Sequence, residues 1–220
     1  MTDLELLHRL ADAAADAILP HFRTGIRVDS KAAGGFDPVT VADREAEEAM
    51  RALIARERPD DGIFGEEFPP VPSRSGRTWV LDPIDGTRGF ITGLPTWGTL
   101  IALSTGDRPV LGMMAQPFVG ERFWTDGERA FWRRGAAEAV LSTRRAARLS
   151  DAVLLATSPD MFSGAAAEGF SRLARAVRHV RWGTDCYGYA MVAAGEADLV
   201  VEVALKPFDI APFVPMIAAA

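Results

Sequence analysis

Apolar residues recur every three or four positions in two N-terminal segments, residues 3–24 and about 41–58, which is the spacing of amphipathic helices. Thr2 or Asp3 can cap the first helix, and Pro20 should kink or end it. The stripes consist of Leu4, Leu7, Leu10, Ala11, Ala14, Ile18 and Leu19 in the first segment and Ala42, Ala46, Met50, Leu53 and Ile54 in the second. Between them, glycines and a proline in residues 28–38 predict an irregular loop or a short hairpin.

The pattern changes to strands after Pro59-Asp60-Asp61-Gly62, which ends the second helix. A short apolar strand over residues 63–65 ends at two glutamates, and the Pro- and Ser-rich segment 68–77 predicts a mobile loop. From Trp79 to about residue 134, apolar or alternating runs are separated by turn signals. The strands expected there begin at Trp79 and continue at residues 99–104, 110–116 and 122–126.

Strands and helices alternate beyond Ala152. The pattern predicts a strand at 153–157, a helix at 165–177, a strand at 179–182, a helix at 186–194 and a strand at 199–203. We therefore predict a single domain over residues 1–220, in which an α+β half (about 1–150) and an α/β half (about 151–220) pack as a layered sandwich. In the helix expected after Asp209, Pro212 fits the first turn and Pro215 should perturb it.

Composition narrows the range of partners. The net charge of the 220 residues is −6 and no block of Lys or Arg stands out, which argues against nucleic-acid binding. Cys186 is the sole cysteine, so an intrachain disulfide framework is excluded. The N-terminus does not resemble a secretory signal, and no apolar segment approaches the roughly 18 residues of a membrane span. We therefore expect a cytoplasmic protein without a membrane partner.

The strand that begins at Trp79 ends in two acids three residues apart, Asp82 and Asp85, with Pro83 between them. Two carboxylates so close repel each other, and oxygen ligands in this arrangement suit a hard divalent cation. Gly86 and Thr87 follow, where the chain is expected to turn into a helix and expose backbone N–H groups to an anion. A cation site beside an anion site predicts phosphate chemistry.

Other acids also stand at the ends of predicted elements, each near a Gly or Pro turn. A single such acid is usually a solvated loop residue or a helix cap, and Asp43 could simply cap the second helix. None of the histidines, His8, His21 and His179, lies near these acids in the sequence, so a carboxylate site for Mg²⁺ or Mn²⁺ is favoured over zinc. The candidates are Asp43, Glu66, Asp82, Asp85 and Asp209.

Three motifs together resemble the inositol monophosphatase family. They are Asp37-x-Val39-Thr40-x-x-Asp43, Gly65-Glu66-Glu67 and Trp79-Val80-Leu81-Asp82-Pro83-Ile84-Asp85-Gly86-Thr87, and the later Trp182-Gly183 and Asp209 fit the same order. The resemblance runs from about residue 5 to the end of the sequence. It implies an αβαβα sandwich, apparently shortened at the C-terminus, with magnesium-dependent, lithium-sensitive phosphatase activity and a homodimeric state.

The resemblance also implies roles for individual residues. Glu66, Asp82 and the Ile84 carbonyl would hold one magnesium ion, Asp82, Asp85 and Asp209 a second, and a third, weaker ion would lie near Glu66. Thr87, hydrogen-bonded to Asp43, would orient the attacking water, and the backbone N–H groups of Gly86 and Thr87 would bind phosphate. Lys31 stands where the family has a lysine near the site, although a surface lysine is an equal alternative.

The substrate is less well determined. Gly89 and Thr92 stand where inositol phosphatases usually have Asn and often His, and the segments 88–95, 182–187 and 205–209 look more like the histidinol-phosphate phosphatases of the family. Histidinol phosphate is cationic outside its phosphate, and Asp185 and Glu202 could face it. Arg88 could pair with Asp185, contact phosphate or repel such a substrate.

Several alternatives stay open from the sequence. Asp185 could cap a helix, the substrate could be inositol 1-phosphate or another small monoester, and the protein could act by binding other proteins. The apolar stretch 99–116 could form a subunit interface or a core strand.

Overall fold

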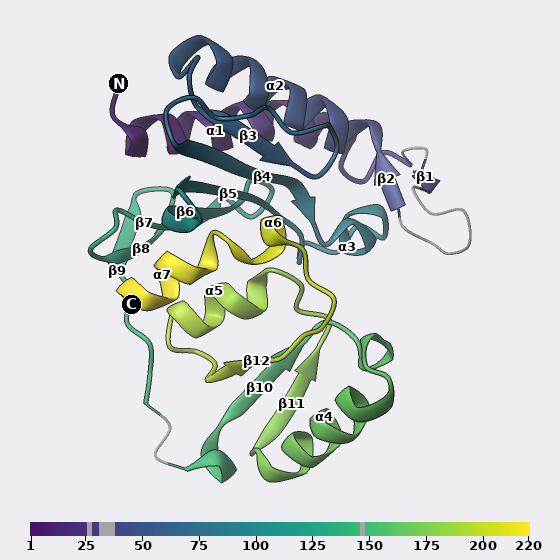
Figure 1. The fold of residues 1–220 in the computed structure, drawn as a ribbon. Helices are drawn as coiled ribbons and strands as arrows, with labels where there is room; N and C mark the ends of the chain where they lie inside the picture. Colours follow the sequence, from purple (N-terminus) through teal and green to yellow (C-terminus); the bar gives the residue numbers. More distant parts are fainter. Residues whose placement is uncertain (26–27, 31–37, 146–147) are drawn as a thin grey trace.

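The helices and strands form alternating layers in a computed structural model, which describes residues 1–25, 28–30, 38–145 and 148–220 (Figure 1). Two N-terminal helices cover one face of a large mixed sheet, and the C-terminal helices cover its other face. A smaller parallel sheet lies beyond those helices and carries one further helix on its outer side. This is the αβαβα sandwich expected from the sequence.

The first layer is formed by α1 (Asp3–Ile18) and α2 (Val41–Glu57). The side chain of Thr2 caps α1 in a reciprocal arrangement with Glu5, and the helix gives way to a 3₁₀ turn at Leu19–His21, where Pro20 stands. The apolar stripes predicted for both helices are buried against the sheet, apart from the partly exposed Leu4 and the exposed Leu19. Burying one leucine side chain contributes about 1.5–3 kcal/mol, so these stripes hold the layer in place.

The large sheet has seven strands in sequential order. They are β3 (Gly62–Gly65), β4 (Arg77–Asp85), β5 (Gly98–Thr105), β6 (Arg108–Gln116), β7 (Glu121–Thr125), β8 (Ala130–Arg134) and β9 (Ala137–Val140). Only β3 and β4 are parallel, and the other neighbours are antiparallel. Helices cover both faces of β5, whose residues 98–104 are all buried. This burial favours the core-strand alternative for that stretch.

The smaller sheet contains three parallel strands, with β10 (Val153–Ala156) between β11 (His179–Trp182) and β12 (Leu199–Val200). The strand expected at 199–203 is therefore shorter than predicted. The helix α4 (Gly164–Ala176) lies on the outer face, whereas α5 (Tyr187–Ala193), α6 (Pro207–Ile210) and α7 (Phe213–Ala219) lie between the sheets (Figure 1). The remaining regular elements are α3 (Thr87–Ile91), 3₁₀ turns at Leu149–Asp151 and Pro159–Met161, and the hairpin of β1 (Val28–Ser30) with β2 (Pro38–Thr40).

Two expectations need correction. The expected helix after Asp209 breaks at Ala211–Pro212 and restarts at Phe213, so Pro215 stands in the first turn of α7, where its missing N–H removes no helical hydrogen bond. The segment 68–77, predicted to be mobile, is tied to the sheet by two hydrogen bonds of 2.8 and 2.9 Å between the backbones of Ile63 and Val71.

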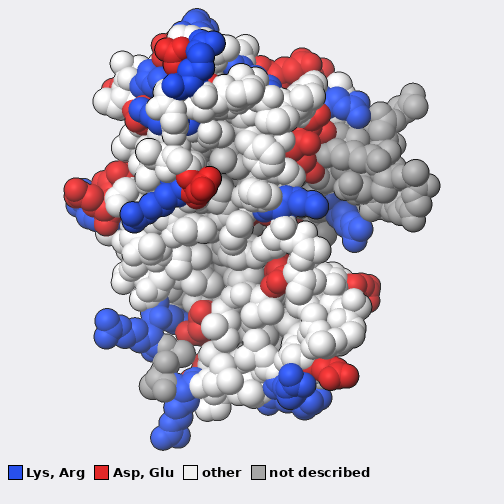
Figure 2. Space-filling view, viewed as in Figure 1, with Lys and Arg blue, Asp and Glu red and all other residues white. Residues whose placement is uncertain are grey.

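The C-terminal helices approach the sheet closely at Gly112 of β6. A Cβ atom there would lie 1.9 Å from the carbonyl oxygen of Pro212, so only glycine permits this packing. Basic and acidic side chains are scattered over the face shown in Figure 2, with uncharged areas between them, and the basic ones do not merge into a continuous patch. Each helix in the described part of the chain is too short or too polar to cross a bilayer.

Candidate metal centre

Asp82 and Asp85 lie on either side of an irregularity in the pairing of β4 with β5. Asp82 is opposite Leu100 and Asp85 is opposite Gly98, so three steps along β4 match two along β5. Residues three apart in a regular strand point to opposite faces, but the extra residue of this bulge brings the two carboxylates to the same place. Pro83 lies in the bulge, and its carbonyl accepts a hydrogen bond of 2.9 Å from the Thr99 hydroxyl.

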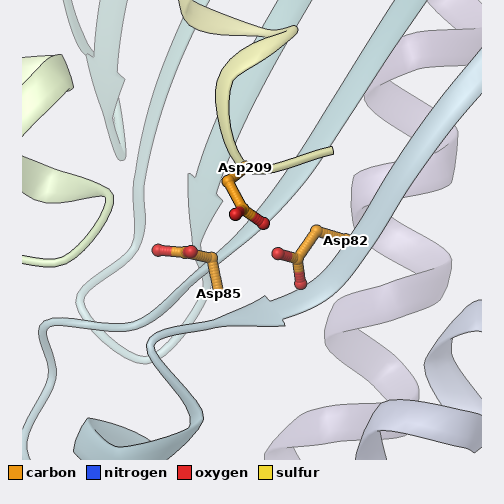
Figure 3. A group of neighbouring side chains, drawn as sticks. All are labelled: Asp82, Asp85 and Asp209. Carbon is orange, nitrogen blue, oxygen red and sulfur yellow. The ribbon is translucent and has the colours of Figure 1, made fainter. Parts of the chain in front are cut away.

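Asp209 brings a third carboxylate from the other side of the site. It lies on α6, and one oxygen atom from each of Asp82, Asp85 and Asp209 falls within 4.8 Å of the others (Figure 3). The backbone N–H of Lys206 donates a 2.7 Å hydrogen bond to Oδ2 of Asp209, which fixes this carboxylate at the start of the helix. The packing of Pro212 on Gly112 holds the same segment against the sheet.

The three acids resist ionisation in this arrangement. Burial is the largest cause that raises the pKa of Asp82 well above its usual value, followed by the charges of Glu66, Asp85 and Asp209. Burial and the charges of Asp185 and Asp209 raise the pKa of Asp85 in the same way. The pKa of Asp209 rises to about 6, because burial and nearby acids outweigh the hydrogen bond from Lys206. A bound cation would favour the charged form of all three.

The donor set fits a hard divalent cation. Oδ1 of Asp82 is buried and has no hydrogen-bond partner among the described residues, so it is a polar atom that a ligand would satisfy. The cluster contains carboxylates and neither His nor Cys. This composition suits Mg²⁺ or Mn²⁺ better than zinc.

Glu66 follows β3 at the edge where the parallel strands β3 and β4 end. Gly65 pairs with Leu81, the residue before Asp82. The Glu66 carboxylate is close enough to Asp82 to raise its pKa by charge and by a hydrogen bond, and it also raises the pKa of Asp209. Glu66 therefore faces the cluster as a fourth acid.

Gly86 and Thr87 begin the short helix α3. Gly86 has a φ of +82°, in the left-handed region that favours glycine, and serves as the N-cap. The Thr87 hydroxyl donates a 3.0 Å hydrogen bond to the carbonyl oxygen of Ile84. The backbone N–H groups at this turn thus stand next to Asp85, as the sequence predicted.

Asp43 is buried in the first turn of α2. Its Oδ2 accepts hydrogen bonds from the backbone N–H of Thr40 at 2.8 Å and from the Thr40 hydroxyl at 2.6 Å, so this side chain does form a helix cap. The contact between Asp43 and Thr87 stays a prediction. Lys31 and Asp37 lie outside the described residues.

Asp185 lies beside the turn at Gly86, because a Cβ atom on that glycine would come within 3.1 Å of the Cβ of Asp185. Its φ is +44°, an uncommon value for a residue other than glycine and one that often marks functional sites. Oδ2 of Asp185 accepts a 3.1 Å hydrogen bond from the Thr96 hydroxyl. The alternative that Asp185 caps α5 is wrong, because the N-cap is Cys186 and it has no side-chain cap.

Glu202 and Arg88 complete the surroundings of Asp185. The Glu202 carboxylate accepts hydrogen bonds from the backbone N–H of Thr157 at 3.0 Å and from the Tyr189 hydroxyl at 2.9 Å. Its charge contributes to the raised pKa values of Asp85, Asp185 and Asp209. Arg88 is exposed, and its charge acts in the opposite direction on the pKa of Asp185.

Residues 2–220 match the sequence profile of the inositol monophosphatase family. The chain belongs to that family. It is 42% identical over 213 residues to the bifunctional phosphatase IMPL2, chloroplastic, of Arabidopsis thaliana, and the match covers 96% of this chain and 60% of that protein. It is 38% identical over 219 residues to a histidinol-phosphatase of Streptomyces coelicolor, with 96% and 81% covered.

Solved structures of the inositol monophosphatase family share the fold. An inositol monophosphatase from Zymomonas mobilis superposes with a TM-score of 0.86 at 45% identity, covering 99% of this chain and 83% of that one. The Thermotoga maritima IMPase gives a TM-score of 0.84 at 27% identity, covering 100% and 84%. The chain thus spans 60% of the Arabidopsis relative and more than four-fifths of the other three proteins.

The sequence did not single out two residues that contribute to the site, Glu47 and Thr96. Glu47 is fully buried one turn after Asp43, on the same side of α2, and contacts the segment that carries Glu66. Its spacing of four from Asp43 was the available signal, because that spacing places two acids on one helix face. Thr96, which holds Asp185, gave no such signal.

Proposed function

We propose that this protein is a magnesium-dependent phosphate monoester hydrolase, with L-histidinol phosphate as its substrate. The observation that carries the reaction type is the convergence of Asp82, Asp85 and Asp209 within 4.8 Å, beside Glu66 and the helix turn that begins at Gly86 and Thr87. Asp82, Asp85 and Asp209, together with Glu66 and the Ile84 carbonyl, would hold two to three Mg²⁺ ions, or Mn²⁺ in their place. When bound, such ions lower the pKa of water and offset the negative charge of a phosphate.

The residues of the chain position the reactants. The N–H groups of Gly86 and Thr87 donate hydrogen bonds to phosphate oxygens and orient the phosphorus toward the carboxylates. Because the Thr87 hydroxyl donates to the Ile84 carbonyl, its oxygen remains free to accept a hydrogen bond from the attacking water. Asp43 would assist this orientation. The water oxygen bonds to phosphorus, the ester P–O bond breaks, and the leaving alcohol takes a proton.

The choice of substrate rests on charge. Asp185 and Glu202 add two carboxylates beside the acidic cluster, on the side of β10 and α5. Histidinol phosphate presents an ammonium group and an imidazole there, and carboxylates recognise such groups through charge-assisted hydrogen bonds. The similarity to histidinol-phosphatases at 36–38% identity supports this substrate.

Inositol 1-phosphate is a second candidate, favoured by the 45% identity to the inositol monophosphatase from Zymomonas mobilis. A neutral polyol gains less from Asp185 and Glu202 than a cation does, and for that reason we rank it second. A homodimer is part of the same proposal and stays a prediction.

Phosphate release from L-histidinol phosphate and from inositol 1-phosphate, each with and without Mg²⁺, tests the proposal. A magnesium-dependent preference for histidinol phosphate is expected. Preference for inositol phosphate would refute the substrate assignment but keep the reaction. If neither ester releases phosphate with Mg²⁺ or Mn²⁺, the proposed phosphatase activity is wrong and a role in binding other proteins is favoured.

A further inference from the structure

A largely buried ion pair lies behind the segment that carries Glu66. Nε of Arg51 donates a 2.7 Å hydrogen bond to Oε1 of Glu47, and the side chains of the two residues are 14% and 0% exposed. Both belong to α2, one helical turn apart. A buried ion pair is costly to desolvate and is weak evidence for stability, so its contacts have to explain its presence.

Every other hydrogen bond that the structure gives for this pair ends on the segment around Glu66. Oε2 of Glu47 accepts a 2.8 Å hydrogen bond from the backbone N–H of Glu67. Nη2 and Nη1 of Arg51 donate to the carbonyl oxygens of Phe68 at 3.0 Å and Pro69 at 3.1 Å. The Arg51 guanidinium also lies 5.7 Å from the centre of the Phe68 ring. Three successive backbone groups after Glu66 are thus fixed to α2.

Gly65 directly precedes Glu66 and restrains the N-terminal side of the same segment. A Cβ atom at this position would lie 2.1 Å from Oε1 of Glu47, so the glycine is what lets the carboxylate reach the backbone. Gly65 is also the last residue of β3 and pairs with Leu81, next to Asp82. Glu66 therefore lies between two restrained segments. Gly65, before it, is paired with the sheet, and the backbone of residues 67–69, after it, is bound by the Glu47–Arg51 ion pair.

These contacts of Glu47 and Arg51 counteract the electrostatic repulsion among the acids of the cluster. Gly65 pairs with Leu81, so Glu66 follows at the strand edge next to Asp82, where Asp82, Asp85 and Asp209 converge, and ionised carboxylates gathered at one place repel one another. Without a support, a loop residue such as Glu66 would relieve the repulsion by moving outward. A ligand that must move back when an ion arrives binds more weakly than one already in place.

We propose that Glu47 and Arg51 form a brace that positions Glu66 for metal binding. The inference rests on the metal centre of the proposed function and is independent of the substrate. The side chains of Glu47 and Arg51 bind each other and the backbone of residues 67–69, so we assign neither as a ligand of the substrate or the ion. Both act through Glu66, as residues behind metal ligands do when their replacement weakens metal affinity or activity by about 10–100-fold.

Glu47→Gln tests the brace, because it keeps the shape and the acceptor for the Glu67 N–H but removes the ion pair. The matched control is Asp61→Asn. Asp61 is also a buried carboxylate, accepting from Nε1 of Trp79 at 3.0 Å and from the Ser75 hydroxyl at 2.7 Å, but it precedes β3 at the opposite end of the strand. Arg51→Lys keeps the charge and serves if Glu47→Gln does not fold.

The readout is the Kd for Mg²⁺ of the full chain without substrate, measured by isothermal titration calorimetry. We expect Glu47→Gln to weaken binding about 10–100-fold, Arg51→Lys to weaken it less, and Asp61→Asn to leave it unchanged. Unchanged affinity in Glu47→Gln, or an equal loss in Asp61→Asn, would overturn the brace alone. No Mg²⁺ binding by the unsubstituted chain would overturn the metal centre and the brace together.

Discussion

The backbone N–H of Cys186 donates a 2.9 Å hydrogen bond to Oδ2 of Asp85, although the two residues are 101 positions apart. Asp85 ends β4 of the large sheet and Cys186 caps α5, so this bond joins the two halves of the chain at the acidic cluster. It favours the charged form of Asp85 against burial and the neighbouring acids. Both halves of the chain therefore determine the position of the Asp85 carboxylate.

Asp85→Asn should abolish Mg²⁺-dependent turnover and stabilise the metal-free protein. The amide oxygen can still accept the hydrogen bond from Cys186, while a buried negative charge is removed from a repulsive cluster. A gain of about 1 kcal/mol would raise the Tm by about 2–4 °C for a chain of this size. Thermal unfolding without metal, together with phosphate release, measures both effects. The exposed Asp107→Asn is the control and should change neither.

The acidic cluster should make the metal-free protein less stable as the pH rises. Asp209, with its pKa of about 6 against the usual 3.8, keeps a proton between those values that the unfolded chain has lost. The folded state binds more protons in this window, so the contribution of Asp209 to the free energy of unfolding falls from pH 4 to pH 6. Acids with lowered pKa values elsewhere act in the opposite direction, which calls for a difference measurement.

Comparison of the unsubstituted chain with Asp209→Asn isolates this effect. Urea midpoints without metal should favour the variant increasingly as the pH rises through this window, and saturating Mg²⁺ should reverse the order. A difference that stays constant with pH would contradict the assignment.

Asp185→Asn should raise the KM for L-histidinol phosphate and leave the KM for inositol 1-phosphate nearly unchanged. A hydrogen bond to a charged group contributes about 1.5–3 kcal/mol, equivalent to roughly 10- to 150-fold in affinity. Steady-state kinetics with both esters checks this. Equal effects on the two substrates would assign Asp185 to structure.

Gly89→Ala should reproduce part of the loss caused by Asp185→Asn, although position 89 lies on α3. The new Cβ would lie 2.9 Å from Oγ1 of Thr96, which would have to move away from the Asp185 carboxylate it now holds. Thr96→Val removes the same hydroxyl without crowding and should give the same preference between substrates. A Gly89→Ala effect that Thr96→Val lacks would point to a direct role of position 89.

Gly112→Ala should weaken both stability and metal binding, because its Cβ would meet the Pro212 carbonyl at 1.9 Å and push α6 from the sheet. Overpacking of this kind costs about 1–3 kcal/mol or more. Gly169→Ala on α4 is the control: its nearest neighbour is 3.8 Å away, and the exchange should stabilise the helix by up to about 1 kcal/mol. Chemical unfolding and Mg²⁺ titration of both variants test this.

The sequence predicted those features that depend on local pattern. The stripe on α1, its start at Thr2 and its end near Pro20 follow from spacing, capping and proline chemistry. Asp82 and Asp85 were recognisable because two acids three residues apart come directly after an apolar run, and aspartates are seldom buried without a partner. The αβαβα order followed from the resemblance of the motifs to a known family.

Contacts between distant segments were not predictable from the sequence, and these contacts decide which polar side chains become buried. Glu47 is part of an i, i+4 pair with Arg51, which in a sequence looks like an ordinary surface ion pair. Its burial depends on Gly65 and on the segment after Glu66 folding over it. The role of Asp185 as a partner of Thr96 depends likewise on two segments 89 positions apart, so a helix cap was an equally good local interpretation.

Asp209 reaches the cluster from the last turns of the described chain, whereas Asp82 and Asp85 come from its first half. Since ribosomes synthesise proteins from the N-terminus, a nascent chain completes most of the large sheet while its carboxylate site still lacks one of its three acids. The cluster of three acids is therefore complete only after residue 209 has been synthesised. A product that ends before α6 would carry the fold's first layers but would lack one of the three acids of the cluster.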